Sequence, residues 1–251
     1  MNTSYMLLFF IVANLIMSFY AFDYITGFIS SSDVTGVSVF LSVMGVIYAI
    51  TAAFVIFEAA SRIGNLTEEM NKETIALRNT YSLVLLMDDK RLKDHVREKI
   101  MSYCTAAKKR LYEDGKGAQK EASQRFRELF SIPGKISIKG KNIETKKIIS
   151  SHIIDALRSS ANARARRRGL LEASMPQLEI YLILFLSFSI VAGFYFMGIA
   201  NKFLFMLVIL LASTAVSAIM YIISDLANPF KGFWNISPEP YDRTLEFLEE
   251  N

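Results

Sequence analysis

The stretch GVSVFLSVMGVIYAITAAFVIF, residues 36–57, contains no charged side chain and decides the class of this protein. A helix needs about 20 predominantly apolar residues to cross a bilayer. Three other stretches, at about 5–22, 180–200 and 203–223, are similarly free of charge. Four such segments exceed what a soluble chain of 251 residues can bury. The sequence therefore predicts an all-α, polytopic membrane protein with four transmembrane helices.

Charged residues are distributed unevenly along the chain. Residues 61–175 hold 25 of the 28 Lys and Arg but only 14 of the 24 Asp and Glu. Because basic loops remain on the cytoplasmic side of a membrane, this segment and both termini are expected in the cytoplasm. The predicted divisions are transmembrane helices 1 and 2 (1–60), a helical cytoplasmic domain (61–175), transmembrane helices 3 and 4 (176–226) and a cytoplasmic tail (227–251). We expect the plasma (inner) membrane, and a first helix that is retained, not cleaved as a signal peptide.

The cytoplasmic segment has the apolar period of helices. Between 68 and 87 the period is near 3.6, and Gly64 alone weakens continuity with the second membrane helix. The stretch MDDKR (87–91) predicts a break with an Asp cap. KISIKGKN (135–142) is read as either a hairpin arm or a loop.

Small residues recur every three or four positions along the second membrane helix. This spacing is typical of close helix packing, but copies of such a face could also surround a pore. Glu58 either pairs with Arg62 or forms an acidic ring at the inner mouth. The residues predicted to face a pore are Ser38, Ser42, Gly45, Ala49, Ala52, Ile56 and Glu58.

The densest basic cluster is ARARRRG at 163–169. It directly precedes a membrane helix, so contact with anionic lipid headgroups is expected in preference to nucleic-acid binding. Some of its arginines could instead pair with acids on other cytoplasmic helices. The residues assigned to the membrane surface are Arg164, Arg166, Arg167 and Arg168.

Residues suited to catalysis or metal binding are few. The two histidines, His95 and His152, show no metal-ligand spacing, and no phosphate-binding or nucleophile motif occurs. The single cysteine, Cys104, cannot form an internal disulfide. We expect no enzymatic activity, no cofactor and no metal.

The stretch SDLANPFKGFWNIS (224–237) follows the last apolar segment. Proline cannot continue a helix, and glycine permits a tight return. Aromatic side chains are placed either at the headgroup level or against the first cytoplasmic helix. The residues of this predicted structural turn are Asp225, Asn228, Pro229, Phe230, Gly232 and Trp234.

The stretch DLANPFKGFWNISPEPYDRTL (225–245) resembles the C-terminal signature of the bestrophin-like family of four-helix membrane proteins. ETIALRNTYSLVLL (73–86) and RRRGLLEASMPQLEIYLILF (166–185) are similar to two further family blocks. The resemblance implies two helix pairs around a cytoplasmic helical domain. The resemblance to true bestrophins is more distant. True bestrophins are pentameric anion channels with a pore lined by the second helix. No acidic run follows Gly232 and no double-aromatic neck is evident, so neither calcium gating nor anion selectivity is carried over.

The leading hypothesis is a homo-oligomeric ion channel, with a pentamer as one expected form, that contacts the lipid bilayer and permeant ions but no nucleic acid. The alternative is a membrane-anchored scaffold or sensor whose basic cytoplasmic domain binds a partner.

Overall fold

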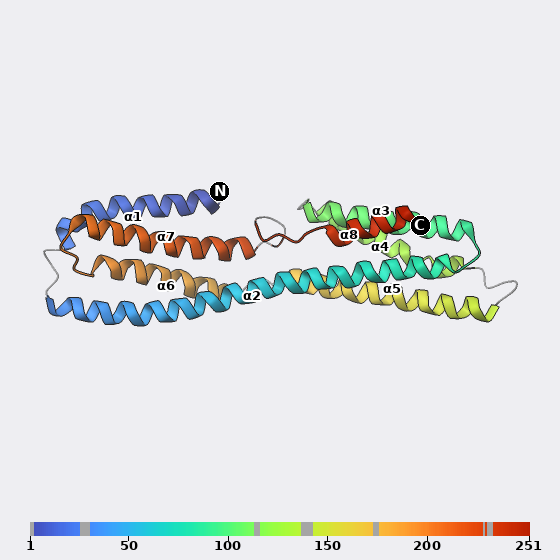
Figure 1. Ribbon diagram of the computed structural model, residues 1–251, viewed down its shortest axis with the longest axis horizontal. Helices are drawn as coiled ribbons and strands as arrows, with labels where there is room; N and C mark the ends of the chain where they lie inside the picture. The colour runs from blue at the N-terminus through green and yellow to red at the C-terminus, as the bar shows by residue number, and fades with distance from the viewer. Residues whose placement is uncertain are drawn as a thin grey trace. The chain divides into compact units, whose positions relative to one another are not determined.

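The computed structural model describes residues 3–25, 31–112, 116–136, 143–172, 176–227, 229 and 233–251. Every regular element among them is helical. These are α1 (Thr3–Ile25), α2 (Ser31–Leu85), α3 (Lys90–Tyr112), α4 (Lys116–Leu129), the 3-10 turn η1 (Pro133–Lys135), α5 (Ile143–Glu172), α6 (Gln177–Tyr195), α7 (Lys202–Ala227) and α8 (Glu239–Glu250) (Figure 1).

The chain folds into two compact units. The apolar unit comprises Met1–Ser61 and Ser174–Trp234, and the polar unit comprises Arg62–Ala173 and Asn235–Asn251. α2 continues unbroken through Gly64, as the sequence predicts, because no proline interrupts it.

The apolar unit contains α1, the first part of α2, α6 and α7. α1 and α6 both pack against α7 (Figure 1). Gly198 has a φ of 67°, a left-handed conformation that glycine adopts without strain, in the link from α6 to α7. The Asn201 side chain then accepts the amide hydrogen of Leu204 at 3.1 Å and caps α7. The left-handed glycine and the Asn201 cap therefore stabilise the connection between α6 and α7.

Among the described residues, α2, α6 and α7 contain stretches long and apolar enough to cross a membrane. The apolar part of α1, Phe9–Phe22, is shorter. α2 packs closely against α6 at Gly193. A Cβ atom at position 193 would lie 2.6 Å from Leu41 Cδ2 on α2, so the lack of a side chain allows this close approach.

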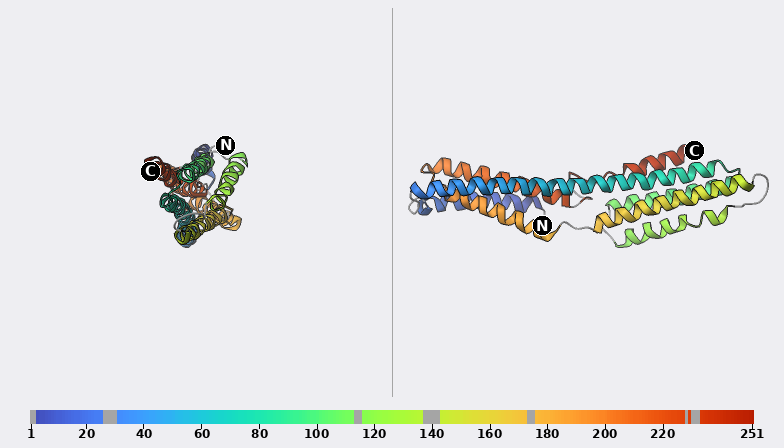
Figure 2. Two further views of the ribbon diagram at one scale, coloured as in Figure 1. Left: turned by 90° about the vertical axis from the view of Figure 1, so that its right-hand side faces the viewer. Right: turned by 90° about the horizontal axis from the view of Figure 1, so that it is seen from below.

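The polar unit is a bundle of the second part of α2 with α3, α4, α5 and α8. α5 runs antiparallel beside α2 in both Figure 1 and Figure 2. Asp89 caps α3, as MDDKR predicts, by accepting the Leu92 amide hydrogen at 3.1 Å. The sequence predicts a tail after residue 227 and no helix within it. The structure instead has α8, which packs on α3 and completely buries Tyr241 and Leu248. η1 covers 133–135, and residues 137–142 of the expected hairpin or loop lie outside the described residues.

Candidate functional site: a free face of α2 and a buried ion-pair network

The part of α2 in the apolar unit has one covered face and one free face. Tyr48, Ala52, Val55 and Ala59 are buried, and their spacing of three or four residues places them on one side of the helix. The large apolar side chains left exposed are Val39, Phe40, Val43, Val46, Ile47, Ile50, Phe54 and Phe57. α2 thus presents a broad apolar surface that the other described residues leave exposed.

One of the predicted pore residues lies on the covered face. Ala52 is 3% exposed and packs inside the apolar unit, so the prediction that it faces a pore is wrong. A stripe of small residues gives the direction of a face around the helix, but not which neighbour covers it. Ser42 and Ala49 are exposed, while Ser38, Gly45 and Ile56 are half-buried beside the covered face.

Glu58 is exposed and lies nine residues beyond Ala49. At 3.6 residues per turn, nine residues are two and a half turns, so these side chains point in opposite directions. Glu58 instead continues a row of exposed side chains at intervals of four residues, which winds around the helix by about 40° at each step. We call Val46, Ile50, Phe54 and Glu58 the α2 ridge.

Arg62 has partners other than Glu58. Its Nε donates to the Leu170 carbonyl oxygen at 2.9 Å, and Nη2 donates to the Leu171 carbonyl oxygen at 3.2 Å. The last carbonyl oxygens of a helix lack partners within the helix and attract cations. Arg62 therefore caps the end of α5, and among the described residues no ion pair to Glu58 is found.

Asp225 organises the predicted turn after α7. Its carboxylate accepts the amide hydrogens of Phe233, at 3.1 Å, and Trp234, at 3.0 Å. Pro229 is buried, whereas Asn228, Phe230 and Gly232 lie outside the described residues. Phe233 and Trp234 are held at the backbone while their side chains remain 87% and 59% exposed.

The basic cluster of α5 divides between two environments. Arg164 and Arg167 are 6% and 3% exposed, so their predicted contact with lipid headgroups is wrong. Helical spacing turns them into the bundle of the polar unit. Arg166 and Arg168 point outward with side chains 71% and 45% exposed, and their role at a membrane surface remains a prediction.

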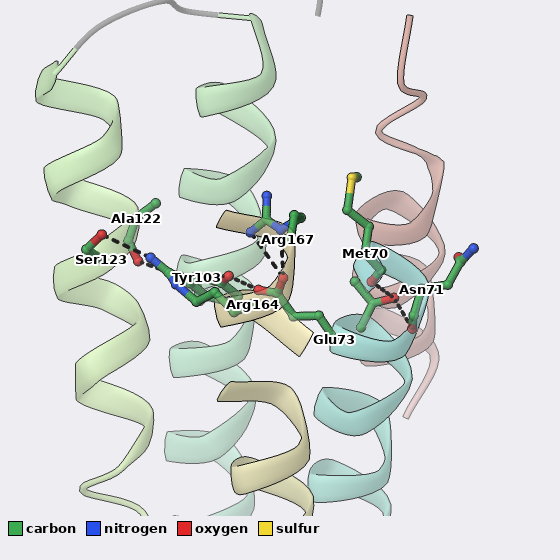
Figure 3. A network of polar contacts seen from close by, with 9 residues as sticks. Met70, Asn71, Glu73, Tyr103, Ala122, Ser123, Arg164 and Arg167 are labelled. Atoms are coloured by element: carbon green, nitrogen blue, oxygen red, sulfur yellow. Dashed lines mark hydrogen bonds and ion pairs between the residues drawn. The ribbon is translucent and has the colours of Figure 1, made fainter. Parts of the chain in front are cut away.

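The buried arginines belong to a continuous polar network (Figure 3). Glu73 on α2 accepts hydrogen bonds from Arg167 Nε, at 3.1 Å, and from the Tyr103 hydroxyl. Arg167 Nη2 also forms an ion pair with the Glu73 carboxylate at 3.1 Å. Arg164 Nη1 donates to the Tyr103 oxygen at 2.8 Å, Nη2 donates to Ser123 Oγ at 3.0 Å, and its guanidinium lies 4.5 Å from the centre of the Phe126 ring. This network joins α2, α3, α4 and α5. It confirms that an arginine of the cluster pairs with an acid on another helix.

The network shifts the proton affinity of its members. Burial is the largest single influence on the Arg167 guanidinium and opposes its charged form. The interactions with Glu73, Tyr241 and Tyr103 together outweigh burial, and the pKa of the guanidinium is raised. Burial, followed by the charge of Glu73, raises the pKa of Tyr103 well above its usual value and keeps the phenol protonated. Burial likewise raises the pKa of Cys104, which makes this thiol unreactive.

The position of Glu73 in the sequence already indicates a buried polar contact. Glu73 lies three residues after Met70 and four before Leu77, on the apolar face that packs into the bundle. An acid at such a position needs a buried partner. Within the described parts of the chain, no group of three His, Cys, Asp or Glu side chains is arranged to hold a metal ion.

Comparisons with known proteins agree on one architecture. A family model described as the Bestrophin-like domain matches residues 8–241. A bacterial bestrophin homologue from Klebsiella pneumoniae is 12% identical, with a TM-score of 0.74, over 97% of this chain and 97% of that chain. Two single-substitution variants of a Klebsiella homologue give TM-scores of 0.76 and 0.77 at 13% and 12% identity; the matches cover 97% and 100% of this chain, and 98% of each structure. These structural likenesses establish the fold. No functionally curated protein matches the chain in sequence.

Proposed function

The chain belongs to the bestrophin-like family, and from this premise we propose that it is a homo-oligomeric ion channel whose pore is lined by α2. The resemblance to the bestrophin channels supports this function, and the small number of residues suited to catalysis in the sequence agrees with it. The observation that carries the proposal is the uncovered α2 ridge.

The proposed topology places the apolar unit in the bilayer of the plasma (inner) membrane, with α1, the apolar part of α2, α6 and α7 as four spans. The polar unit and both termini are then cytoplasmic. The support is the charge distribution, since 25 of the 28 basic residues lie between 61 and 175.

Self-association is proposed because four helices with so few charges cannot enclose a conduit. The apolar stretch of α2 is 17% buried within the chain, against 39% for α6 and 28% for α7. Of these three helices, α2 therefore has the most surface available for other copies of the chain. Ser42 and Ala49, small and exposed along one edge of the free face, would let a neighbouring helix approach closely.

In this arrangement the α2 ridge faces the axis. Val46, Ile50 and Phe54 form three successive apolar rings, and such constrictions gate ion flow by excluding water. Glu58 forms an acidic ring one turn further, at the cytoplasmic mouth. A ring of carboxylates favours cations, so we propose cation over anion permeation.

The test is ion flux through the purified oligomer in liposomes. Phe54→Ala should increase flux several-fold because it widens a ring. Phe185→Ala on α6, a side chain of matched exposure (63% against 60%), should leave flux unchanged. Glu58→Gln should lower the ratio of cation to anion permeability.

A pore is ruled out if the intact wild-type oligomer conducts no ions under varied voltage, calcium and membrane tension. Equal effects of Phe54→Ala and Phe185→Ala would instead show that flux occurs but the ridge does not line it. The scaffold or sensor alternative predicts an assembly with no continuous path along its axis.

A further inference from the structure

The apolar unit contains a cavity that the proposed pore does not use. It has a volume of about 390 Å³ and lies between α1 and α6, both of which pack on α7. Ala13, Ala21 and Ala192 contribute small side chains to its walls, which leaves the space open. This volume is within the range of small-molecule sites, which are typically about 300–1,000 Å³ and mostly apolar.

The cavity has an apolar rim and a polar floor. Met17, Phe188 and Phe196 are exposed at the rim. Asn14, Val191 and Tyr195 are each at most 6% exposed and form the floor. None of the described residues that line the cavity is charged.

The Asn14 side chain is incompletely hydrogen-bonded. Its Nδ2 donates to the Phe10 carbonyl oxygen at 2.8 Å, one turn back on α1. The Tyr195 hydroxyl donates to the Asn14 carbonyl oxygen at 2.9 Å and lies 3.4 Å from Oδ1. A carboxamide has two N–H groups, and among the described residues only one of them has an acceptor. A polar hydrogen buried without a partner is costly, and an acceptor oxygen placed in the cavity would satisfy it.

The position of Asn14 along α1 restricts the source of that oxygen. Asn14 lies eleven residues from each end of Thr3–Ile25, which is about 16 Å along the helix axis. If α1 spans the membrane as proposed above, Asn14 lies near the middle of a hydrocarbon layer about 30 Å thick. Phospholipid ester and headgroup oxygens stay at the interface and do not reach this depth. A carboxylate is also excluded, since a charge is costly here and the cavity offers no counter-ion.

We propose that this cavity binds a neutral, apolar molecule carrying one carbonyl oxygen, which accepts a hydrogen bond from the free N–H of Asn14. The aromatic and aliphatic rim contacts its hydrocarbon body. The site depends on the membrane location of the apolar unit, but it does not depend on conduction.

The test uses benzophenone as a photoreactive probe on the full-length protein in liposomes. Under near-ultraviolet light its excited carbonyl abstracts a hydrogen atom from a nearby C–H group, and the two carbon radicals join into a C–C bond. Mass spectrometry should map saturable labelling to the cavity-lining residues of α1 and α6. Dicyclohexyl ketone should suppress this labelling at about five- to tenfold lower mole fraction in the membrane than dicyclohexylmethane, which has the same shape without the oxygen.

Two variants separate the polar contact from the space. Asn14→Leu should abolish the difference between the two competitors, while the Tyr195 hydroxyl keeps its acceptor on the backbone at position 14. Ala192→Phe should fill the cavity and remove the labelling with Asn14 intact. Gel filtration and thermal melting check that each variant assembles.

Labelling that does not saturate, or that is spread evenly over all apolar helices, would show that ordinary lipid chains occupy the groove and would overturn the proposal. Equal competition by the ketone and the hydrocarbon in the wild-type protein would overturn it too, even if Asn14→Leu failed to fold. Because no readout is ion flux, these outcomes are independent of whether the protein conducts.

Discussion

The Glu73–Arg167 pair offers the sharpest test of how the polar unit is held together. Glu73 is completely buried and Arg167 is 3% exposed, and the two are joined by contacts of 3.1 Å from both Nε and Nη2. Glu73→Gln keeps the size of the side chain and the acceptor for Tyr103, but it leaves Arg167 as a buried cation without a counter-charge.

Breaking a buried ion pair from one side costs about 3–5 kcal/mol, because the remaining charge is desolvated and unpaired. For a chain of this size, that loss lowers the melting temperature by about 6–20 °C. The assay is thermal unfolding of the purified full-length protein, followed by far-ultraviolet circular dichroism.

The matched control is Glu68→Gln, five residues earlier on α2. Glu68 also forms an ion pair, with Lys72 at 2.7 Å, but its side chain is 61% exposed. Solvent-exposed pairs contribute little, so the melting temperature should barely change. The double variant Glu73→Gln with Arg167→Met should recover more than half of the loss, since the stranded cation is gone. Equal melting temperatures for Glu73→Gln and Glu68→Gln would refute the reasoning.

Three further predictions concern other parts of the chain. Burial, followed by the charges of Lys135 and Lys99, lowers the pKa of His95. Below the ordinary pKa of 6.5 the unfolded chain therefore binds more protons than the folded protein, and the free energy of unfolding should fall as the pH drops. His95→Gln should flatten this part of a melting-temperature profile, and an unchanged slope would contradict the assignment. Asp225→Ala should accelerate hydrogen exchange at the amides of Phe233 and Trp234. Asp225→Asn keeps one acceptor oxygen and should accelerate this exchange less. Unchanged exchange in Asp225→Ala would show that the carboxylate does not hold the turn. Trp234 is the single tryptophan, so its fluorescence should be quenched more by lipids labelled near the headgroup than by lipids labelled at the chain end, and emission typical of full solvation would place the turn away from the bilayer.

Family and helical class could be predicted from the sequence because both depend on local pattern. Charge-free segments, the absence of proline through Gly64 and the Asp89 cap each act over a few residues, and the structure has the corresponding helices. Motifs such as DLANPFKGFWNIS identify the family for the same reason, since the residues of a turn are neighbours in the chain.

The exposed face of α2 could not be predicted from the sequence. A repeat of three or four residues places Ser42, Ala49 and Ala52 toward one side of α2, but the packing of the apolar unit covers Ala52 and leaves the α2 ridge exposed. Helical period fixes the angles between side chains on one helix. It does not fix which angle the neighbouring helices occupy.

By itself, the sequence determined that the chain is an all-α, bestrophin-like protein with apolar helices on either side of a basic helical segment. Only the tertiary structure decided which of the three consecutive arginines at 166–168 is buried. Arg167 meets Glu73 across 94 residues of sequence, while Arg166 and Arg168 on either side of it point outward. Such a contact exists only after separate helices pack together, because the free energy that allows a charge to be buried comes from its partner and not from its own segment.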